Sequence, residues 1–534
     1  MIRTALAAGF LGILALLYIV TRNPPIHRNG QRLRQPPDTL PFLGNAIQFL
    51  KPRHVLFDWF VKCQQQFGKE TVEIAVPSLP PGVVINSAEN LEFVLKNESS
   101  ITKGEFFRER SWDLFGYGII NATGDLWRAQ RKAGLKFFSG ANLDALAEEV
   151  LPEVYAGTRK HLLQAANDGS VIDLQKVFLD LTTTVVGHMA YDAGPPMEIS
   201  ASSPFSKAFD HASGHIGLRF QNPLYRLTEL FTGGDFRTSL AEVKRFGRQI
   251  VANARKRRAR TAFESLITHD ETPSEDAPEF ETLIDWLIEA LAAPQLVADA
   301  ALNFLSAGRD TTAQSLTWTF YALMRHPEAL RQLRDELDAK FRNAKHDHSQ
   351  VLGESRKDED DGRVDVDRID IASLQPTFLP LTVATFYEAL RLYPPVPFEI
   401  KQTSEPVTLP DGTFLPAGAI VVWSIYAMNR SIETFGSDAT TFCPTRWLDD
   451  QGRLVPKSPY EFPVFNGGPR ACLGKKMAEV MAAWVMVRMW TEWEFEEVVA
   501  PHEKGRERLS ANSLTLPMEG GLPCRVRVKD RQGS

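Results

Sequence analysis

The amino-acid sequence predicts a mainly α-helical protein with small β-sheets, folded as a single large domain after an N-terminal transmembrane helix. The chain opens with an unbroken apolar run from Ala5 to Val20. Helical patterns dominate the remainder, the clearest of them from Leu296 to Arg325, whereas strand-like segments are short. Residues suited to chemistry are spread from Trp127 to Cys472 and belong to one site. Most of the 534 residues must therefore fold as one unit.

Residues 1–22 are predicted to be a membrane anchor. With Met1 and Ile2, the apolar run is just long enough to cross a bilayer with little tilt. The alternative is a cleaved signal peptide, but no small-residue cleavage site follows the run. Basic residues after the run outnumber Arg3, which predicts a single pass with the main domain in the cytoplasm. These residues are Arg22, Arg28, Arg32 and Arg34.

Residues 23–45 are predicted to form a proline-rich hinge, and residues 46–534 the main domain. Asp411-Gly412 predicts a hairpin turn. The segment from Lys345 to Asp370 is rich in charged and polar residues, which predicts a solvated surface loop. The expected strands are Glu70 to Val76, Val83 to Asn86 and Ala419 to Trp423.

Composition and charge exclude other classes of protein. The net charge of −6 gives no indication of nucleic-acid binding. The sequence contains only four cysteines, so no disulfide framework is expected and a reducing compartment is indicated. They are Cys63, Cys443, Cys472 and Cys524.

The apolar run from Leu296 to Arg325 predicts one buried helix, which His326-Pro327 ends because the residue before a proline avoids the α region. Gly308 removes a side chain at mid-helix, so a large group can lie against the backbone. Thr311 can bond back to the Ala307 carbonyl and open a notch for water or dioxygen. The alternative is a simple helix kink in which the threonine satisfies its own backbone.

Glu388 and Arg391 are three residues apart, on one face of a predicted helix. Most such pairs are solvated and contribute under about 1 kcal/mol. The neighbours from Phe378 to Val396 are mostly apolar, so this pair is expected to be buried and fully hydrogen-bonded.

A cysteine lies among glycines between Phe465 and Gly474, directly before an apolar helix. This pattern indicates a thiolate site built to hold a heme iron. Backbone N–H groups at the helix start can lower the pKa of the Cys472 thiol, and the glycines let the chain approach the sulfur and the porphyrin. Arg470 can pair with a heme propionate, and Phe465 can cover the proximal side. The alternative is an inert buried cysteine.

Five positions of this segment match the signature Phe-x-x-Gly-x-Arg-x-Cys-x-Gly, namely Phe465, Gly468, Arg470, Cys472 and Gly474. On these residues the chain resembles the cytochrome P-450 heme-thiolate monooxygenases, and its N-terminus resembles their membrane-anchored eukaryotic, microsomal type. The resemblance implies the cytochrome P-450 fold, a heme b cofactor and Cys472 as the axial ligand of the iron.

The resemblance also implies roles for residues upstream. Trp127 and Arg131 match a Trp-x-x-x-Arg helix whose side chains reach a heme propionate, although a lone pair of this kind is more often core packing. Lys401 stands where the family often has another propionate arginine. Asp310 and Thr311 match the acid and alcohol that relay protons during dioxygen activation.

The resemblance implies a structural role for the other matched positions. It also implies that a separate protein supplies the electrons. The trio of Glu388, Arg391 and Arg446 would hold the proximal side in shape. No domain for flavin or nicotinamide follows Cys472, so an NADPH-dependent flavoprotein reductase in the endoplasmic reticulum membrane is implied. The reductase would dock on a patch of basic residues. The alternative, equally well supported, is that these residues are ordinary solvated charges. These are Arg128, Lys132, Lys136, Lys475 and Lys476.

The candidate wall residues are apolar and predict a small lipophilic substrate, with dioxygen as co-substrate. The string from Asn303 to Trp318 resembles the branch of the family that hydroxylates fatty acids and alkanes near the chain end. A lipophilic natural product is the alternative substrate. A heme-thiolate isomerase or dehydratase is an alternative function that the Asp310-Thr311 pair disfavours. A heme sensor or electron carrier is another, which an open and apolar distal pocket disfavours. The wall residues are Phe106, Phe107, Trp112, Phe115, Ile119, Phe304, Val396, Phe398, Leu514 and Leu516.

Overall fold

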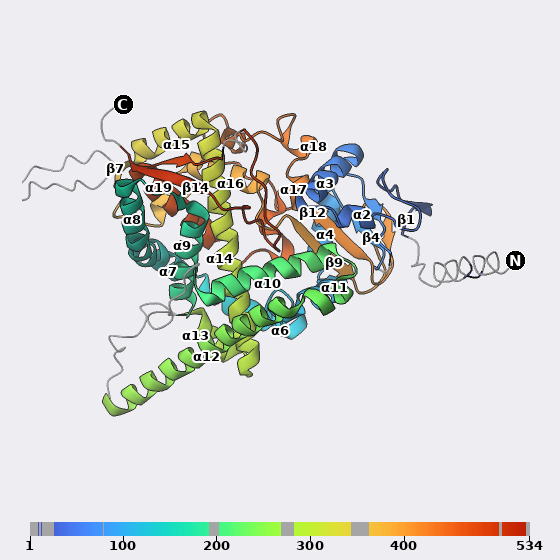
Figure 1. Ribbon diagram of the computed structural model, residues 1–534, viewed down its shortest axis with the longest axis horizontal. Helices are drawn as coiled ribbons and strands as arrows, with labels where there is room; N and C mark the ends of the chain where they lie inside the picture. Colours follow the sequence, from blue (N-terminus) through green and yellow to red (C-terminus); the bar gives the residue numbers. More distant parts are fainter. Residues whose placement is uncertain are drawn as a thin grey trace, which may run out of the picture.

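Helices make up most of the computed structural model, and its strands are two to six residues long. This agrees with the predicted mainly α-helical class with small sheets (Figure 1). The structure describes Gly9, Gly12 and residues 26–77, 79–191, 202–268, 282–342, 363–500 and 505–529.

Helix α14 (Pro294–Arg325) passes through the middle of the molecule (Figure 1). It begins at a proline, whose fixed φ suits the first helical turn, and ends at His326 before the next proline, as predicted. Most of its residues are buried because helices cover several sides of it. It packs against α9 (Leu174–Tyr191), α12 (Gly234–Thr268) and α16 (Pro380–Leu392).

The remaining helices surround this core. In the first half of the chain they are α2 (Ala46–Phe49), α3 (Arg53–Phe67), α4 (Ala88–Lys96), α5 (Gly104–Phe115), α6 (Gly124–Phe137), α7 (Gly140–Ala145), the π-helix η1 (Leu146–Val150), α8 (Leu151–Asp168), α10 (Pro204–Gln221) and α11 (Tyr225–Thr232). In the second half they are α13 (Leu283–Ala290), α15 (Pro327–Lys340), α17 (Ile425–Met428), α18 (Ile432–Phe435) and α19 (Lys475–Glu492), with the 3₁₀ turns η2 (Ala372–Leu374), η3 (Pro444–Trp447), η4 (Pro463–Phe465) and η5 (Gly468–Arg470).

The largest sheet has the strand order β3-β4-β12-β9-β5 and lies beside α2 and α3 (Figure 1). Its strands are β3 (Val72–Ile74), β4 (Gly82–Val84), β5 (Ile101–Thr102), β9 (Phe398–Thr403) and β12 (Ile420–Ser424). The expected strands around positions 72, 83 and 420 are therefore present, with shifted ends. β4 and β12 are parallel, and the other neighbours are antiparallel.

Three smaller sheets complete the fold. A four-stranded sheet has the order β10-β11-β1-β2, a three-stranded sheet the order β13-β14-β6, and β7 pairs with β8 in parallel. Gly412 has φ +81 in the turn between β10 and β11, as the predicted hairpin requires. The strands are β1 (His27–Arg28), β2 (Gln31–Arg32), β6 (Ile172–Asp173), β7 (Phe341–Arg342), β8 (Val364–Asp365), β10 (Val407–Thr408), β11 (Thr413–Leu415), β13 (Trp493–Glu497) and β14 (Pro523–Val528).

The predicted peripheral segments have mixed outcomes. β1 and β2 fall within the predicted hinge and pair with each other, and β1 also pairs with β11, so the described part of the hinge is attached to a sheet of the main domain. The predicted loop from Lys345 to Asp370 contains β8, and its residues 345–362 lie outside the described residues. Apart from Gly9 and Gly12, the predicted anchor run also lies outside them. None of the helices described in the structure is both long and apolar enough to cross a membrane.

Candidate active site

The cysteine segment predicted from the sequence is a tight loop between η5 and α19. The Cys472 N–H donates to the Phe465 carbonyl at 2.8 Å and closes the loop. Gly468 has φ +65, and a Cβ there would overlap the carbonyl oxygen of Leu95 in α4. Gly468 is therefore needed for packing on α4. A Cβ at Gly474 would meet Phe138 at an ordinary 3.6 Å.

The Cys472 side chain is exposed, yet surrounding protein atoms raise the pKa of its thiol because burial disfavours the thiolate. Both facts fit a residue on the wall of an internal space. A backbone hydrogen bond from Gly474 and the charge of Arg131 lower the pKa, but less than burial raises it. The expected lowering of this pKa by a backbone N–H at the helix start is therefore present, but burial outweighs it. A bound metal cation is needed to hold the thiolate.

Helix α6 brings the cysteine loop to α14. Arg131 Nη1 donates to the Ala471 carbonyl at 3.0 Å. A Cβ at Gly134 would lie 2.9 Å from Leu473 Cδ1 and 3.1 Å from Phe304 Cζ. Only a glycine lets these three segments approach so closely. The loop and the middle of α14, predicted as parts of one site, therefore face the same helix.

The middle of α14 carries the predicted back-bond. Thr311 Oγ1 donates to the Ala307 carbonyl at 2.6 Å. Ala307 is exposed although its preceding neighbours in the helix are buried, so open space lies beside the helix at this turn. Gly308 faces elsewhere: a Cβ there would lie 2.9 Å from Val186 of α9. The large group against Gly308 is thus a neighbouring helix.

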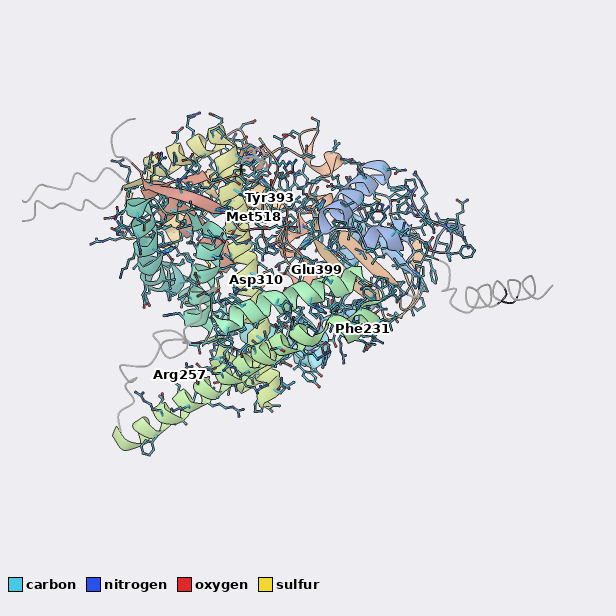
Figure 2. All side chains as sticks on the ribbon, viewed as in Figure 1. Phe231, Arg257, Asp310, Tyr393, Glu399 and Met518 are labelled. Atoms are coloured by element: carbon cyan, nitrogen blue, oxygen red, sulfur yellow. The ribbon has the colours of Figure 1, made fainter. Side chains whose placement is uncertain are left out.

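Asp310 is buried beside Arg309, which sequence reasoning did not single out (Figure 2). Arg309 Nη1 lies 2.5 Å from Asp310 and 2.7 Å from Asp210 of α10, whose side chain is half exposed. Burial raises the pKa of Asp310 to about 6, against the opposing charge of Arg309. A carboxyl group with this pKa exchanges protons readily near neutral pH.

The predicted pair of Glu388 and Arg391 is fully buried in α16. Arg391 Nε and Nη2 each donate to Glu388 at 2.8 Å, and its remaining donors reach three backbone carbonyls. The carbonyls belong to Asn429, Ala439 and Thr441. All five donors of the guanidinium are therefore satisfied, as a buried charge requires.

The third expected member of this network is also in place. Arg446 Nε donates to Glu388 at 2.9 Å, and Arg446 Nη2 pairs with Asp438 at 2.7 Å. Trp447 Nε1 adds a bond of 2.9 Å to Glu388, and the Cys443 N–H one of 2.8 Å. Sequence reasoning missed Trp447 and Asp438, although Trp447 directly follows Arg446. The network fixes the segment before the cysteine loop onto α16.

The chain matches the Cytochrome P450 family model over residues 34–522. The chain belongs to the cytochrome P450 family. Cytochrome P450 CYP94D109 of Paris polyphylla is 31% identical over 467 residues, covering 84% of this chain and 86% of that protein. Cytochrome P450 CYP94D108 of the same plant is 31% identical over 515 residues, covering 93% and 94%. Cytochrome P450 704B1 of Arabidopsis thaliana is 30% identical over 521 residues, covering 94% and 96%.

The predicted family is therefore confirmed, and this P450 is a heme monooxygenase whose cofactor takes an axial cysteine thiolate. The residues near Cys472 fit a heme. The Trp127 ring lies 4.8 Å from the guanidinium carbon of Arg470 and 5.6 Å from that of Arg131. Arg131 is partly buried and pairs with no carboxylate among the described residues. A cation in this state suits a heme propionate.

Two of the residues predicted to reach a propionate contact Glu98, which the sequence reading missed. Arg470 Nε donates to one oxygen of Glu98, and Lys401 Nζ lies 2.7 Å from the other. Lys401 also donates to the Val94 carbonyl at 3.2 Å, and burial lowers the pKa of its amine. The predicted propionate role of Lys401 therefore has no support in this P450, whereas Arg470 also bonds to Ala122 and stacks on Trp127.

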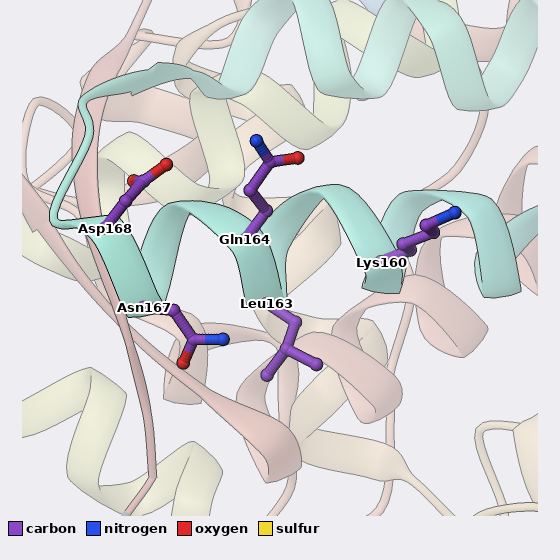
Figure 3. Close-up of a pocket in the computed structure, with 5 residues that line it drawn as sticks. All are labelled: Lys160, Leu163, Gln164, Asn167 and Asp168. Atoms are coloured by element: carbon purple, nitrogen blue, oxygen red, sulfur yellow. The ribbon is translucent and has the colours of Figure 1, made fainter.

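Other predicted wall residues belong to aromatic clusters. The Phe398 ring lies 5.1 Å from that of Phe57 and 4.8 Å from that of Phe60, and Trp112 packs against Tyr117. A separate hollow of about 410 Å³ lies on α8 (Figure 3). Its lining residues all come from that one helix, so it has no opposing wall and takes no part in the site.

Proposed function

We propose that this P450 inserts one oxygen atom from dioxygen into a long-chain fatty acid or alkane at or near the chain terminus. The observation that carries the proposal is the arrangement on α14, where the back-bonded Thr311 adjoins Asp310 with its pKa of about 6. An isomerase or dehydratase does not activate dioxygen and therefore does not need such a proton route. Apolar wall residues and the Asn303–Trp318 string favour a long chain, and oxidative tailoring of a lipophilic natural product is the second candidate.

Each proposed site residue has a defined task. Cys472 ligates the iron, Phe465 covers the proximal side, and Gly468 and Gly474 shape the loop. Trp127, Arg131 and Arg470 bind the propionates, and Arg131 also ties the loop to α6 through Ala471. When bound, the heme supplies the reductive activation of dioxygen and the insertion of one oxygen atom.

Protons reach the site through α14. Asp310 takes a proton from the side of Asp210 and solvent, since its pKa of about 6 allows both states near neutral pH. The Thr311 hydroxyl keeps its position by donating to the Ala307 carbonyl at 2.6 Å, and its free lone pairs would accept a hydrogen bond from the water that carries the proton onward to the site. Exclusion of other water keeps electrons on the productive route.

The Thr311→Ala variant should bind heme normally but form at least about tenfold less product for each NADPH consumed, because proton delivery fails. The measurement is product and hydrogen peroxide per NADPH. Thr317→Ala is the matched control, since Thr317 Oγ1 makes the same back-bond, to Ala313 at 2.7 Å, from a fully buried position. Unchanged coupling in Thr311→Ala would remove Thr311 from the mechanism.

The substrate proposal is tested by incubating the reconstituted enzyme with fatty acids, alkanes and polycyclic terpenoids, then identifying the products by mass spectrometry. Terminal C–H bonds are stronger than interior ones, so oxidation at the chain end must come from positioning. Loss of the Phe304 or Phe398 ring should shift products toward interior positions. If only a polycyclic compound gives a binding spectrum and product, the natural-product candidate is correct.

We further propose that the chain is anchored in the endoplasmic reticulum membrane by residues 1–22, with its domain in the cytoplasm. Large apolar side chains exposed in the hinge and on α11 support membrane contact: Phe42 is 81% exposed and Phe231 89%. The full chain should stay with membranes after a carbonate wash at high pH, and removal of residues 1–22 should weaken this attachment. A glycosylated domain would show that the orientation is reversed.

An NADPH-dependent flavoprotein reductase is the proposed electron donor, docked on the exposed face of α6. Arg128, Lys132 and Lys136 are spaced four residues apart there, so they share one face. Lys132→Glu should raise the reductase concentration for half-maximal NADPH oxidation about tenfold at low salt. Lys160→Glu on α8 is the control. Equal values for both variants would place the docking surface elsewhere.

A further inference from the structure

A narrow slot lies between the large sheet, α5 and the end of α10. It encloses about 560 Å³, and part of this space is open to solvent. Within it, the centre of a water molecule can occupy about 50 Å³. Its walls are largely apolar, and its charged lining residues are Arg110 and Arg219. The apolar walls include Phe49, Ile74, Phe106, Phe220, Ile400 and Val422. Largely apolar walls that include an arginine suit an alkyl chain with a polar end.

The two arginines differ in their partners. Arg219 Nε and Nη2 donate to the two oxygens of Glu229 at 2.6 and 2.8 Å, and Nη2 also lies 2.8 Å from Asp113. Its positive charge is therefore paired with carboxylates. Glu109, the acid next to Arg110 in sequence, pairs with Arg226 of α11 at 3.2 Å.

Arg110 has no such partner. It is 5% exposed, and among the described residues its guanidinium donates only to carbonyl oxygens: Nε to Arg219 at 3.2 Å and Nη1 to Phe106 at 3.1 Å. Of five N–H donors, three find no acceptor there. The guanidinium carbon also lies 3.6 Å from the Phe106 ring centroid. Burial lowers the pKa of Arg110, which reflects the cost of a buried cation without an anion.

We propose that Arg110 binds the carboxylate of a free fatty acid in this slot, with the alkyl chain along its apolar wall. This inference rests on the proposed function and names the end of the substrate that is held. The planar guanidinium fork can accept a carboxylate through parallel hydrogen bonds, and the bound anion would neutralise the buried cation. The pairing needs no change in the bonds that already fix Arg110.

The position of the slot suits this role. α5 forms one wall and also packs against α14, which carries Thr311. β9 contributes Ile400 to the slot and begins at Phe398, a predicted wall residue of the reaction site. A chain held at Arg110 by its carboxyl end and extended toward α14 would bring its opposite end to the reaction site, which would favour oxidation at the chain terminus.

The test compares palmitate with its methyl ester and with hexadecanol by spectral titration of the full-length heme enzyme. Wild type should bind palmitate at least about tenfold more tightly than the ester, as expected for a charge-assisted hydrogen bond. Arg110→Met should bind acid and ester equally, and Arg110→Lys should keep part of the preference. Arg226→Met is the control, since this nearby side chain is 70% exposed, and it should retain the wild-type ratio.

Each outcome decides the proposal. No acid preference in wild type, or an unchanged preference in Arg110→Met, would overturn it. The carbon-monoxide spectrum reports whether each variant holds heme. If Arg110→Met does not, the decision passes to Arg110→Lys, for which an unchanged ratio would count against the carboxylate site. If palmitate, ester and alcohol all fail to bind wild type, the proposed long-chain substrate itself is wrong; if only the preference is missing, the function stands and this site does not.

Discussion

The Cys472→Ala variant should lose the red-shifted Soret band of the reduced carbon-monoxide complex, and its monooxygenase turnover should fall to background. The band and the reaction both depend on electron donation by a thiolate, which an alanine cannot supply. Expression and a difference spectrum of the purified protein provide the measurement. A variant that kept the band would show that another residue ligates the iron.

Cys443→Ala is the matched control for this prediction. Cys443 is also a free and partly exposed thiol, but its contact with the buried network is made by its backbone N–H, which the substitution leaves in place. Its spectrum should stay like that of wild type. The contrast separates loss of the iron ligand from loss of a nearby thiol.

Sequence reasoning succeeded where one short segment carried its own evidence. The signature around Cys472 identified the family, and His326-Pro327 predicted the end of α14 at Arg325. The back-bond from Thr311 to Ala307 needed only helical spacing. The buried state of Glu388 and Arg391 followed from apolar neighbours along a single helix.

It failed where the partner lies far away in the chain. Glu98 is hundreds of residues from Arg470 and Lys401, so nothing in the local sequence indicated that it would pair with both. Asp210 joins Arg309 only because α10 crosses α14. Gly308 predicted the close approach of a large group but could not identify it, because the neighbouring residue, Val186, lies in another helix. The pKa of Cys472 depends on burial, which the segment alone does not reveal.

The Arg391→Ala variant should be the least stable of the variants considered. It leaves the Glu388 charge buried with one guanidinium fewer and leaves the carbonyls of Asn429, Ala439 and Thr441 without this donor. Removing one member of a buried pair costs about 3–5 kcal/mol. The expected result is a lower unfolding midpoint in urea and poor heme retention, because the same network holds the segment before the cysteine loop.

Two further variants show whether the network, rather than arginine content, sets this stability. Arg453→Ala breaks a surface pair with Asp449 at a side chain that is 74% exposed, so it should change the free energy of unfolding by under about 1 kcal/mol. Arg391→Lys keeps the charge but has three donors instead of five, and cannot hold Glu388 through a fork while reaching all three carbonyls. Its stability should fall between Arg391→Ala and wild type. If Arg391→Ala instead unfolds at the urea concentration of Arg453→Ala and keeps its heme, then Glu388 is held by Arg446, Trp447 and the Cys443 backbone without help from Arg391.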